Sequence, residues 1–151
     1  MRSLDRIIGT DREAGAATAF VVAFAVVLLV LAGLVVDGGL AINARQKVAD
    51  DVEQAARAGS QHLDLETLRN PAGGVVQIDP VAAQTAARDF LASRNYPASG
   101  VAVSATAQQV SVSAQIEQPT ALLSLIFIDH FTIRAQGQAR PAVGVTGEDT
   151  P

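Results

Sequence analysis

The hydrophobic pattern of the chain is dominated by one uninterrupted apolar run near the N-terminus. Residues 14–36 contain no charged side chain, and the only hydroxyl among them is that of Thr18. As a helix rising about 1.5 Å per residue, this run would be about 35 Å long, enough to cross a hydrocarbon core of about 30 Å. A buried core helix is the alternative, but a chain with five Phe, one Tyr and no Trp is poorly equipped to cover so long an apolar rod. The pattern therefore predicts a transmembrane helix over residues 14–36.

After this run the pattern becomes amphipathic and keeps the spacing of a helix. Small and apolar residues recur on one face, while charged residues occupy the others. The residues on the apolar face are Leu40, Ala44, Val48, Val52, Ala55, Ala56, Gly59 and Leu63. We therefore expect the membrane helix to continue as an amphipathic extension over residues 37–63, with a bend at Gly38-Gly39.

The rest of the chain predicts a small domain over residues 64–143. Residues 70–74 are typical of a loop, and Asp79-Pro80 is typical of a helix start, with the helix ending before Tyr96-Pro97. The period then changes to two, which is typical of strands. The expected strands are 101–107 and 110–116, joined as a hairpin at 108–109, and a third strand from 131 to about 140.

The complete pattern predicts an α+β fold class, with a long N-terminal transmembrane helix, one further helix and about three antiparallel strands. Residues 119–128 form an apolar patch that we interpret as a short helix. Residues 144–151 are polar and are expected to form a disordered tail.

The charges bear on which side of the membrane the domain lies. Three arginines within residues 1–13 precede the span, and three cations within residues 45–57 follow it, so the count itself is balanced. Arg12 lies two residues from the span, whereas the other end carries Asp37. We therefore predict a short cytoplasmic segment over residues 1–13 and an extracytoplasmic C-terminal domain in the cell membrane. The span exceeds the apolar region of about 7–15 residues in a cleaved signal peptide, which favours an uncleaved anchor.

The composition excludes several classes of function. The net charge of −4 arises from clusters of mixed sign, so there is no basic face for nucleic acid. The chain has no cysteine, which excludes disulfides, thiolate catalysis and cysteine-ligated metals. His62 and His130 lie in no ligand-spaced motif, and we interpret Asp50, Asp51 and Glu53 as a solvated, salt-bridged helix face. We predict no enzymatic activity, no cofactor and no metal.

Asp37 is the most informative charged residue because it ends the apolar run. An acid at this position is typical of an interfacial group that fixes the depth of the helix. The alternative is that it pairs with a cation on a partner helix in the membrane.

Several residues in the N-terminal part follow a recurring order. A glycine precedes the span, an Asp-x-Gly follows it, and an Arg-Gln pair and an Ala-Ala-x-Ala-Gly segment come next. The residues at these positions are Gly15, Asp37, Gly39, Arg45, Gln46, Ala55, Ala56, Ala58 and Gly59. In this order residues 13–60 resemble the TadE/TadG-like pilus-assembly family, bacterial membrane proteins related to tight-adherence (Flp) pili.

The resemblance implies a non-enzymatic, single-pass membrane protein that takes part in assembling or anchoring a Tad-type pilus. Its implied partners are the lipid bilayer and other pilus-assembly membrane proteins. Packing against other membrane helices, including self-association, would use the small residues of the span, namely Gly15, Ala16, Ala19, Ala23 and Gly33.

The resemblance also bears on processing of the leader. Pilin-like relatives carry a glutamate five residues after the glycine, where this chain has Phe20. This departure favours the TadG-like branch and predicts that the chain is not efficiently cut between Gly15 and Ala16. The alternatives are a processed minor pilin, and a membrane-tethered binding or sensing module unrelated to pili.

Overall fold

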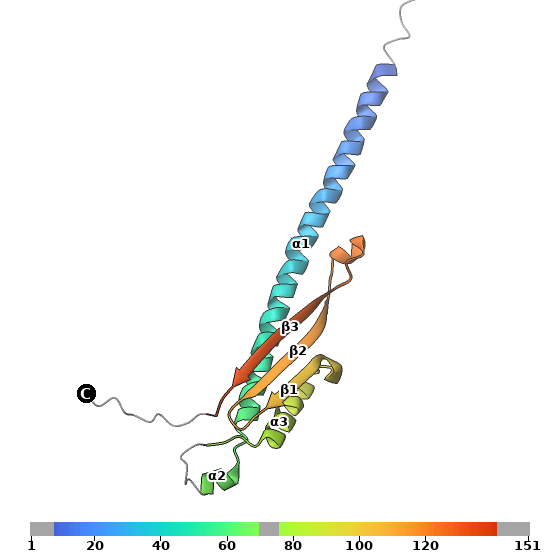
Figure 1. Ribbon diagram of the computed structural model, residues 1–151. Coiled ribbons are helices and arrows are strands. Elements are labelled where there is room, and N and C mark those ends of the chain that lie inside the picture. The colour runs from blue at the N-terminus through green and yellow to red at the C-terminus, as the bar shows by residue number, and fades with distance from the viewer. Residues whose placement is uncertain (1–7, 70–75, 142–151) are drawn as a thin grey trace, which may run out of the picture. The chain divides into compact units, whose positions relative to one another are not determined.

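The structure, a computed structural model, describes residues 8–69 and 76–141 (Figure 1). The chain divides into two compact units. The first, which we call the apolar unit, comprises Met1–Leu40 and Pro119–His130. The second, which we call the sheet unit, comprises Ala41–Gln118 and Phe131–Pro151. The predicted loop at 70–74 and the predicted tail at 144–151 lie wholly outside the described residues, as do residues 1–7.

One long helix, α1 (Ile8–Ser60), contains both the apolar run and the amphipathic stretch that follows it. The helix is unbroken at Gly38 and Gly39. It ends three residues before the predicted position, because the backbone of the next residues pairs elsewhere. Leu63 forms an isolated antiparallel bridge with Ile78, and the N–H of Asp64 donates to the carbonyl of Gln77 at 2.9 Å. Pairing with this distant segment removes residues 61–63 from the helix.

The second predicted helix is α3 (Pro80–Ser93). The side chain of Asp79 accepts hydrogen bonds from the N–H groups of Val81 and Ala82, and Pro80 occupies the first turn, where it needs no hydrogen-bond acceptor. Its buried face consists of Ala83, Ala87 and Leu91. The prediction of a helix between Asp79 and Tyr96 is confirmed.

The three predicted strands form one antiparallel sheet in the order β1-β2-β3. They are β1 (Val101–Ala105), β2 (Val110–Pro119) and β3 (His130–Ala139). β1 and β2 pair with Val103 opposite Val112. Their turn is closed by the N–H of Thr106, which donates to the carbonyl of Gln109 at 2.8 Å. The predicted hairpin is confirmed, and the fold class is α+β.

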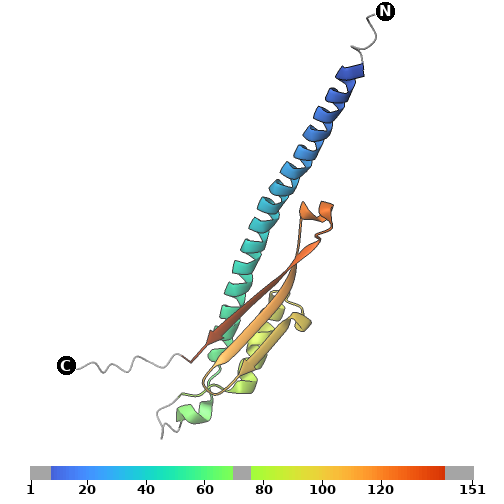
Figure 2. The ribbon, with the colours of Figure 1, turned by 45° about the horizontal axis from the view of Figure 1, so that its top comes forward.

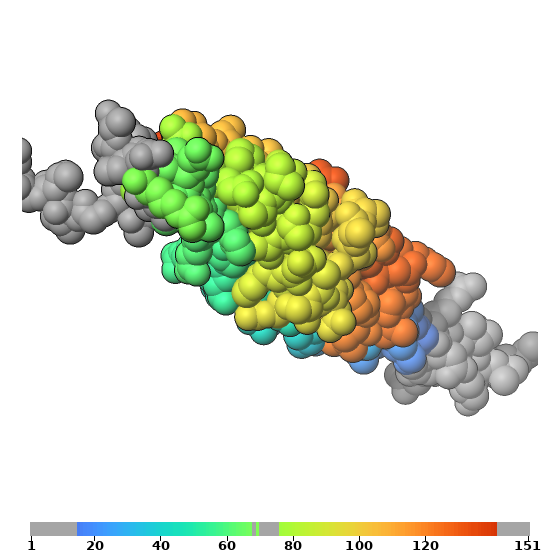
Figure 3. Space-filling model, turned by 90° about the horizontal axis from the view of Figure 1, so that it is seen from below, coloured from blue at the N-terminus to red at the C-terminus, as the bar shows by residue number. Residues whose placement is uncertain are grey.

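The core of the sheet unit lies between one face of the sheet and two helices, α3 and residues 41–60 of α1 (Figure 2). Its fully buried residues are Val48, Val52, Ala55 and Ala56 of α1, Ile78, Ala83, Ala87 and Leu91 at α3, and Val110, Val112, Ala114 and Ile133 of the sheet. Small residues set the spacing at this core. A Cβ on Gly59 would lie 2.8 Å from the carbonyl oxygen of Ala83, and one on Gly137 would lie 2.8 Å from the backbone nitrogen of Glu53. The C-terminal end of α1 consequently lies beside α3 (Figure 3).

Three short helical segments complete the described elements, and one of them, the 3₁₀ turn η1 (Ala98–Gly100), leads into β1. α2 (Leu65–Arg69) was not predicted, although its start carries a local signal. The Asp64 carboxylate accepts from the N–H of Glu66 at 2.9 Å, as an N-cap does. The apolar patch at 119–128 contains a 3₁₀ turn, η2 (Leu123–Ile126), where a short helix was expected.

Candidate membrane and assembly site

The apolar unit exposes a continuous apolar surface along α1. Phe20 is 71% exposed and Leu29 is 50% exposed, and most of the other large side chains between residues 20 and 36 are similarly accessible. Among the described residues, α1 is the one helix long and apolar enough to cross a membrane by length and composition. Soluble proteins rarely expose so large an apolar patch, so this surface needs a partner or a lipid environment.

Small residues of α1 form a shallow hollow on this surface. Gly15, Ala19 and Ala23 recur every four residues and, with Thr18 and Val22, line the hollow. Nothing lies within 4 Å of the position that a Cβ on Gly15 would occupy. Small residues at a spacing of four allow the backbone of another membrane helix to approach closely. Ala16, which follows Gly15 at the possible processing site, is also exposed.

Gly33 was predicted to belong to the same packing surface, and this interpretation is wrong. Gly33 is buried by Leu122 and Leu123. A Cβ built at this position would lie 3.1 Å from the Cβ of Leu122 and 3.5 Å from the Cδ2 of Leu123. Both leucines belong to the apolar unit. Gly33 therefore packs against the chain's own loop instead of facing a partner helix.

One turn after Gly33, Asp37 binds the same loop through its carboxylate. Its oxygens accept hydrogen bonds from the N–H groups of Ala121 at 2.8 Å, Leu122 at 2.9 Å and Leu123 at 2.7 Å. These donors lie at the start of η2, where helical N–H groups have no acceptor within the turn. Asp37 is therefore a capping residue supplied by a segment more than eighty residues away.

The environment of Asp37 keeps it charged. It is 1% exposed. Burial on its own raises the pKa of the carboxyl, but the hydrogen bonds from Leu123, Ala121 and Leu122 outweigh it, and the pKa of Asp37 lies below its usual value. Three backbone donors of the same chain satisfy the carboxylate, so Asp37 acts as an internal clamp on this loop. Its interfacial depth stays a prediction.

The loop held by Asp37 is itself apolar and exposed. We call residues 121–128 the apolar tip. Leu123 is buried, whereas Leu125 is 65% and Phe127 is 93% exposed, and Ile126 and Ile128 are also exposed. Phe127 has φ of 66°, which is unusual for an aromatic residue and reverses the chain at the end of η2.

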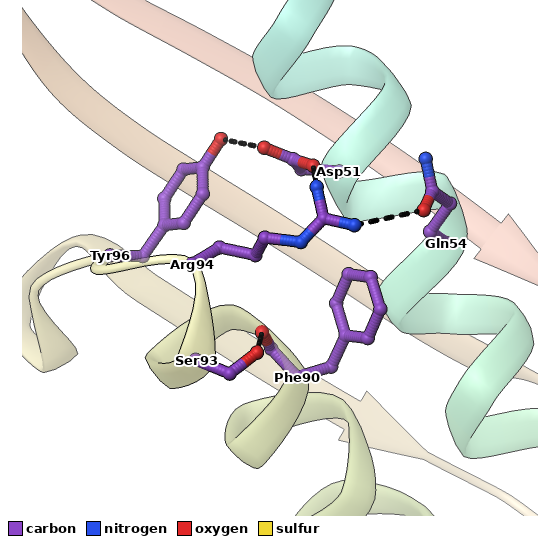
Figure 4. A network of polar contacts seen from close by, with 6 residues as sticks. All are labelled: Asp51, Gln54, Phe90, Ser93, Arg94 and Tyr96. Atoms are coloured by element: carbon purple, nitrogen blue, oxygen red, sulfur yellow. Dashed lines mark hydrogen bonds and ion pairs between the residues drawn. The ribbon is translucent and has the colours of Figure 1, made fainter.

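A second buried carboxylate, that of Asp51, lies in the sheet unit (Figure 4). Nη1 of Arg94 donates to its Oδ1 at 2.7 Å, and the hydroxyl of Tyr96 donates to its Oδ2 at 2.8 Å. The guanidinium also donates to Gln54 at 3.4 Å and lies 4.9 Å from the centre of the Phe90 ring. The network fastens the end of α3 to α1 across a sequence separation of more than forty residues.

The network corrects the interpretation of Asp51 as part of a solvated face. Its side chain is 2% exposed, although that of Arg94 is 43% exposed. Burial, followed by the hydrogen bond to Asp51 and the negative charge of that residue, raises the pKa of Tyr96 well above its ordinary range. The phenol therefore remains a donor at physiological pH. Glu53 does fit the predicted face, since it pairs with Arg57 at 3.2 Å on the surface.

The family-motif positions separate into three groups. Asp37 clamps the apolar tip, while Ala55, Ala56 and Gly59 are buried in the core of the sheet unit and Ala58 is half-buried. The remaining motif positions are Gly15, Gly39, Arg45 and Gln46, all of which are exposed on α1. The alanine-rich segment therefore has a packing role, because small side chains let α3 approach α1.

The structure brings together no candidate catalytic group among the described residues. His62 and His130 are both exposed, and they lie in different units. Within residues 8–69 and 76–141, no cluster of three or more histidine, aspartate or glutamate side chains is arranged to hold a metal ion.

Sequence reasoning missed the partners of both buried aspartates. For Asp51 a signal exists, because it lies three residues after Val48 and four before Ala55, on the apolar face of the helix. For Asp37 no local signal identifies residues 121–123, because the donors are backbone groups of an apolar loop.

Comparison with known proteins gives a match to a family model. Residues 15–88, just under half of the chain, match the family described as putative Flp pilus-assembly TadE/G-like. No curated protein and no solved structure matches the chain. The matched residues include the exposed apolar segment of α1, Asp37 and the alanine-rich core segment. Over these residues the chain is therefore similar to the TadE/G-like pilus-assembly family.

Proposed function

We propose that the protein is a non-enzymatic, single-pass membrane protein of the TadE/G-like family, nearer its TadG-like branch, and that it assembles or anchors a Tad-type pilus. Residues 14–36 of α1 cross the cell membrane, residues 1–13 stay in the cytoplasm, and the sheet unit lies outside. The observation that carries the proposal is the family match over residues 15–88, which begins at the exposed apolar segment of α1.

Two surfaces are suited to assembly. In the membrane, the hollow at Gly15, Ala19 and Ala23 fits the backbone of another helix. Outside the membrane, β1 and β3 are the two edges of the sheet, and an edge strand offers backbone groups for pairing with another chain.

Deletion of the gene in its own bacterium tests the proposal. We expect loss of surface pili in electron micrographs and recovery on complementation with the wild-type chain. Complementation with the double variant Val27→Arg and Leu31→Arg should fail, because each arginine near the centre of the span costs about 2.5–3.5 kcal/mol for insertion. The matched control is Val27→Leu with Leu31→Val, which keeps the segment apolar and should restore the pili. Normal piliation in the deletion strain would overturn the proposal.

We further propose that the leader stays attached, so that the protein acts as a fixed anchor and is not extracted into the filament. Phe20 stands where pilin-like relatives have an acid, and its uncharged side chain cannot form an ion pair with the free amino terminus of a neighbouring subunit. The intact mass of the membrane-purified protein tests this. Retention of residues 1–15 is expected, and their loss from most molecules would make a minor pilin the better assignment.

A further inference from the structure

Besides the span, the apolar unit carries a second surface suited to lipid. We propose that the apolar tip, residues 121–128, inserts into the interfacial layer of the membrane beside the span and forms a second contact with the lipid. The inference rests on the proposed function, because it requires that α1 crosses the bilayer.

Contacts with α1 fix the depth of the tip within the apolar unit. Leu122 and Leu123 pack against Gly33, and Asp37 holds the amides of residues 121–123. Gly33 lies inside the apolar run, three residues before its end, which is about 4.5 Å along the axis. The base of the tip therefore lies beside the last turn of the span. Amphipathic segments that lie in an interface sink to a similar depth, about 5–10 Å.

The chemistry of the tip suits this environment. Residues 119–128 carry no charge, and the first charged residue after them is Asp129. Four large apolar side chains are exposed in succession, at Leu125, Ile126, Phe127 and Ile128. Exposed to water they would lose the free energy of burial, which grows with the apolar area removed from water.

Backbone polar groups are the usual obstacle to placing a loop near hydrocarbon, and here most of the N–H groups are already satisfied. Asp37 accepts the N–H groups of residues 121–123. Within the tip, the N–H of Leu125 donates to the carbonyl of Leu122, and those of Phe127 and Ile128 donate to Ser124 and Leu123, each at 3.1 Å. At its base, the N–H of Thr120 donates to the carbonyl of Asp129 at 3.0 Å.

Lipid is favoured over a protein partner because the tip is continuous with a surface that lipid must cover. The helix beside it exposes Leu29, Leu34 and Val36, and the contacts with Gly33 keep the tip alongside that helix. A loop that lies beside the last turn of a membrane-crossing helix is at the depth of the interfacial layer of the membrane. A second copy of the chain is the competing occupant, and the experiment below separates the two.

Tryptophan fluorescence tests the inference, because the chain has no tryptophan of its own. Phe127→Trp and Leu125→Trp each place one indole on the exposed tip, and neither side chain supports the core. Val27→Trp marks the centre of the span, and Val81→Trp, at a site that is 75% exposed in the sheet unit, marks solvent. Each full-length variant is placed at one copy per phosphatidylcholine nanodisc, with lipids brominated at shallow or deep positions of the acyl chain.

We expect both tip variants to show blue-shifted emission relative to Val81→Trp and stronger quenching by the shallow than by the deep bromines. Val27→Trp should show the opposite preference. Tip variants that behave like Val81→Trp, with Val27→Trp quenched, would overturn this inference and leave the proposed span intact. An unquenched Val27→Trp would instead overturn the proposed function. A blue shift that is absent from these single-copy discs but present in discs prepared with two copies would identify a second chain as the occupant and overturn the lipid assignment.

Discussion

Asp37 ends the apolar run, and its structural role follows from the needs of another segment. The start of η2 presents three backbone donors in an apolar loop, and water would otherwise have to solvate them. A buried carboxylate without partners would be costly, and so would three buried amides without an acceptor. The carboxylate accepts the hydrogen bonds that the three amides need to donate, and Asp37 thereby sets the position of the loop beside the helix.

Replacing Asp37 by alanine should release the apolar tip. The amides of Ala121, Leu122 and Leu123 would lose their acceptors, and we expect their hydrogen exchange to accelerate by about tenfold or more. Exchange in the core strands should stay unchanged, because those amides belong to the sheet unit. Asp50→Ala is the matched control, since it removes an exposed carboxylate from the same helix. Unchanged exchange at residues 121–123 in Asp37→Ala would contradict the clamp.

The clamp should also depend on pH in a definite direction. The pKa of Asp37 lies below its ordinary value of 3.8 in the folded protein, so the stabilisation is complete at neutral pH and persists above the unfolded pKa. It is lost as the pH falls through the lowered folded pKa. The amide resonances of residues 121–123 should therefore titrate together with a midpoint below 3.8. A midpoint above that value, or the same titration in Asp37→Asn, would show that another group is responsible.

At the scale of elements, much of the fold follows from local patterns. The alternation of apolar and polar residues over 101–116 predicts the hairpin, and Asp79-Pro80 predicts the start of α3, because both signals depend only on neighbouring residues. The end of α1 could not be predicted in this way. Leu63 and Asp64, just after the helix, pair with Ile78 and Gln77, and no local sequence signal identifies so distant a partner.

The same limit applies to the site. The exposed apolar stretch and its small residues could be predicted from composition and spacing, whereas the burial of Gly33 could not. A glycine in an apolar helix is equally consistent with packing against a partner and with packing against its own chain. The choice depends on where residues 122 and 123 fold, which the sequence around Gly33 does not record.

The small-residue hollow on α1 predicts helix association in the membrane. The double variant Ala19→Ile and Ala23→Ile fills the hollow and should weaken self-association of the full chain in bilayers by about tenfold, which corresponds to about 1.4 kcal/mol of lost packing. The matched control, Ala17→Ile with Ala25→Ile, adds the same side chains on the opposite side of the helix. Energy transfer between labelled chains measures the effect. Equal weakening by both pairs would contradict a specific hollow.

At the scale of the whole molecule, α1 belongs to both units, and the sheet unit cannot be complete without it. Its residues Val48, Val52, Ala55 and Ala56 are fully buried in the core. Each fully buried valine contributes about 1.5–3 kcal/mol, a large share of the 5–15 kcal/mol that stabilises a typical domain. A soluble domain cut off after the helix would leave one face of its sheet uncovered.

Truncation tests this dependence. A chain that begins at Gly39 should unfold cooperatively on heating, whereas one that begins at Asp64 should show no cooperative transition by circular dichroism. Within the longer chain, Val52→Ala should lower the melting temperature, while Ile42→Ala, at a position that is 64% exposed, should leave it nearly unchanged. Equal melting of the two truncations would show that α1 is not part of the core.

The central claim is that α1 crosses the membrane and holds the sheet unit outside. Because the chain lacks cysteine, one engineered thiol reports its own location. Val81→Cys, at an exposed position of α3, should react with a membrane-impermeant maleimide in intact spheroplasts, and Ser3→Cys should react only after permeabilisation. The reverse pattern, or labelling of both thiols in intact spheroplasts, would contradict the account.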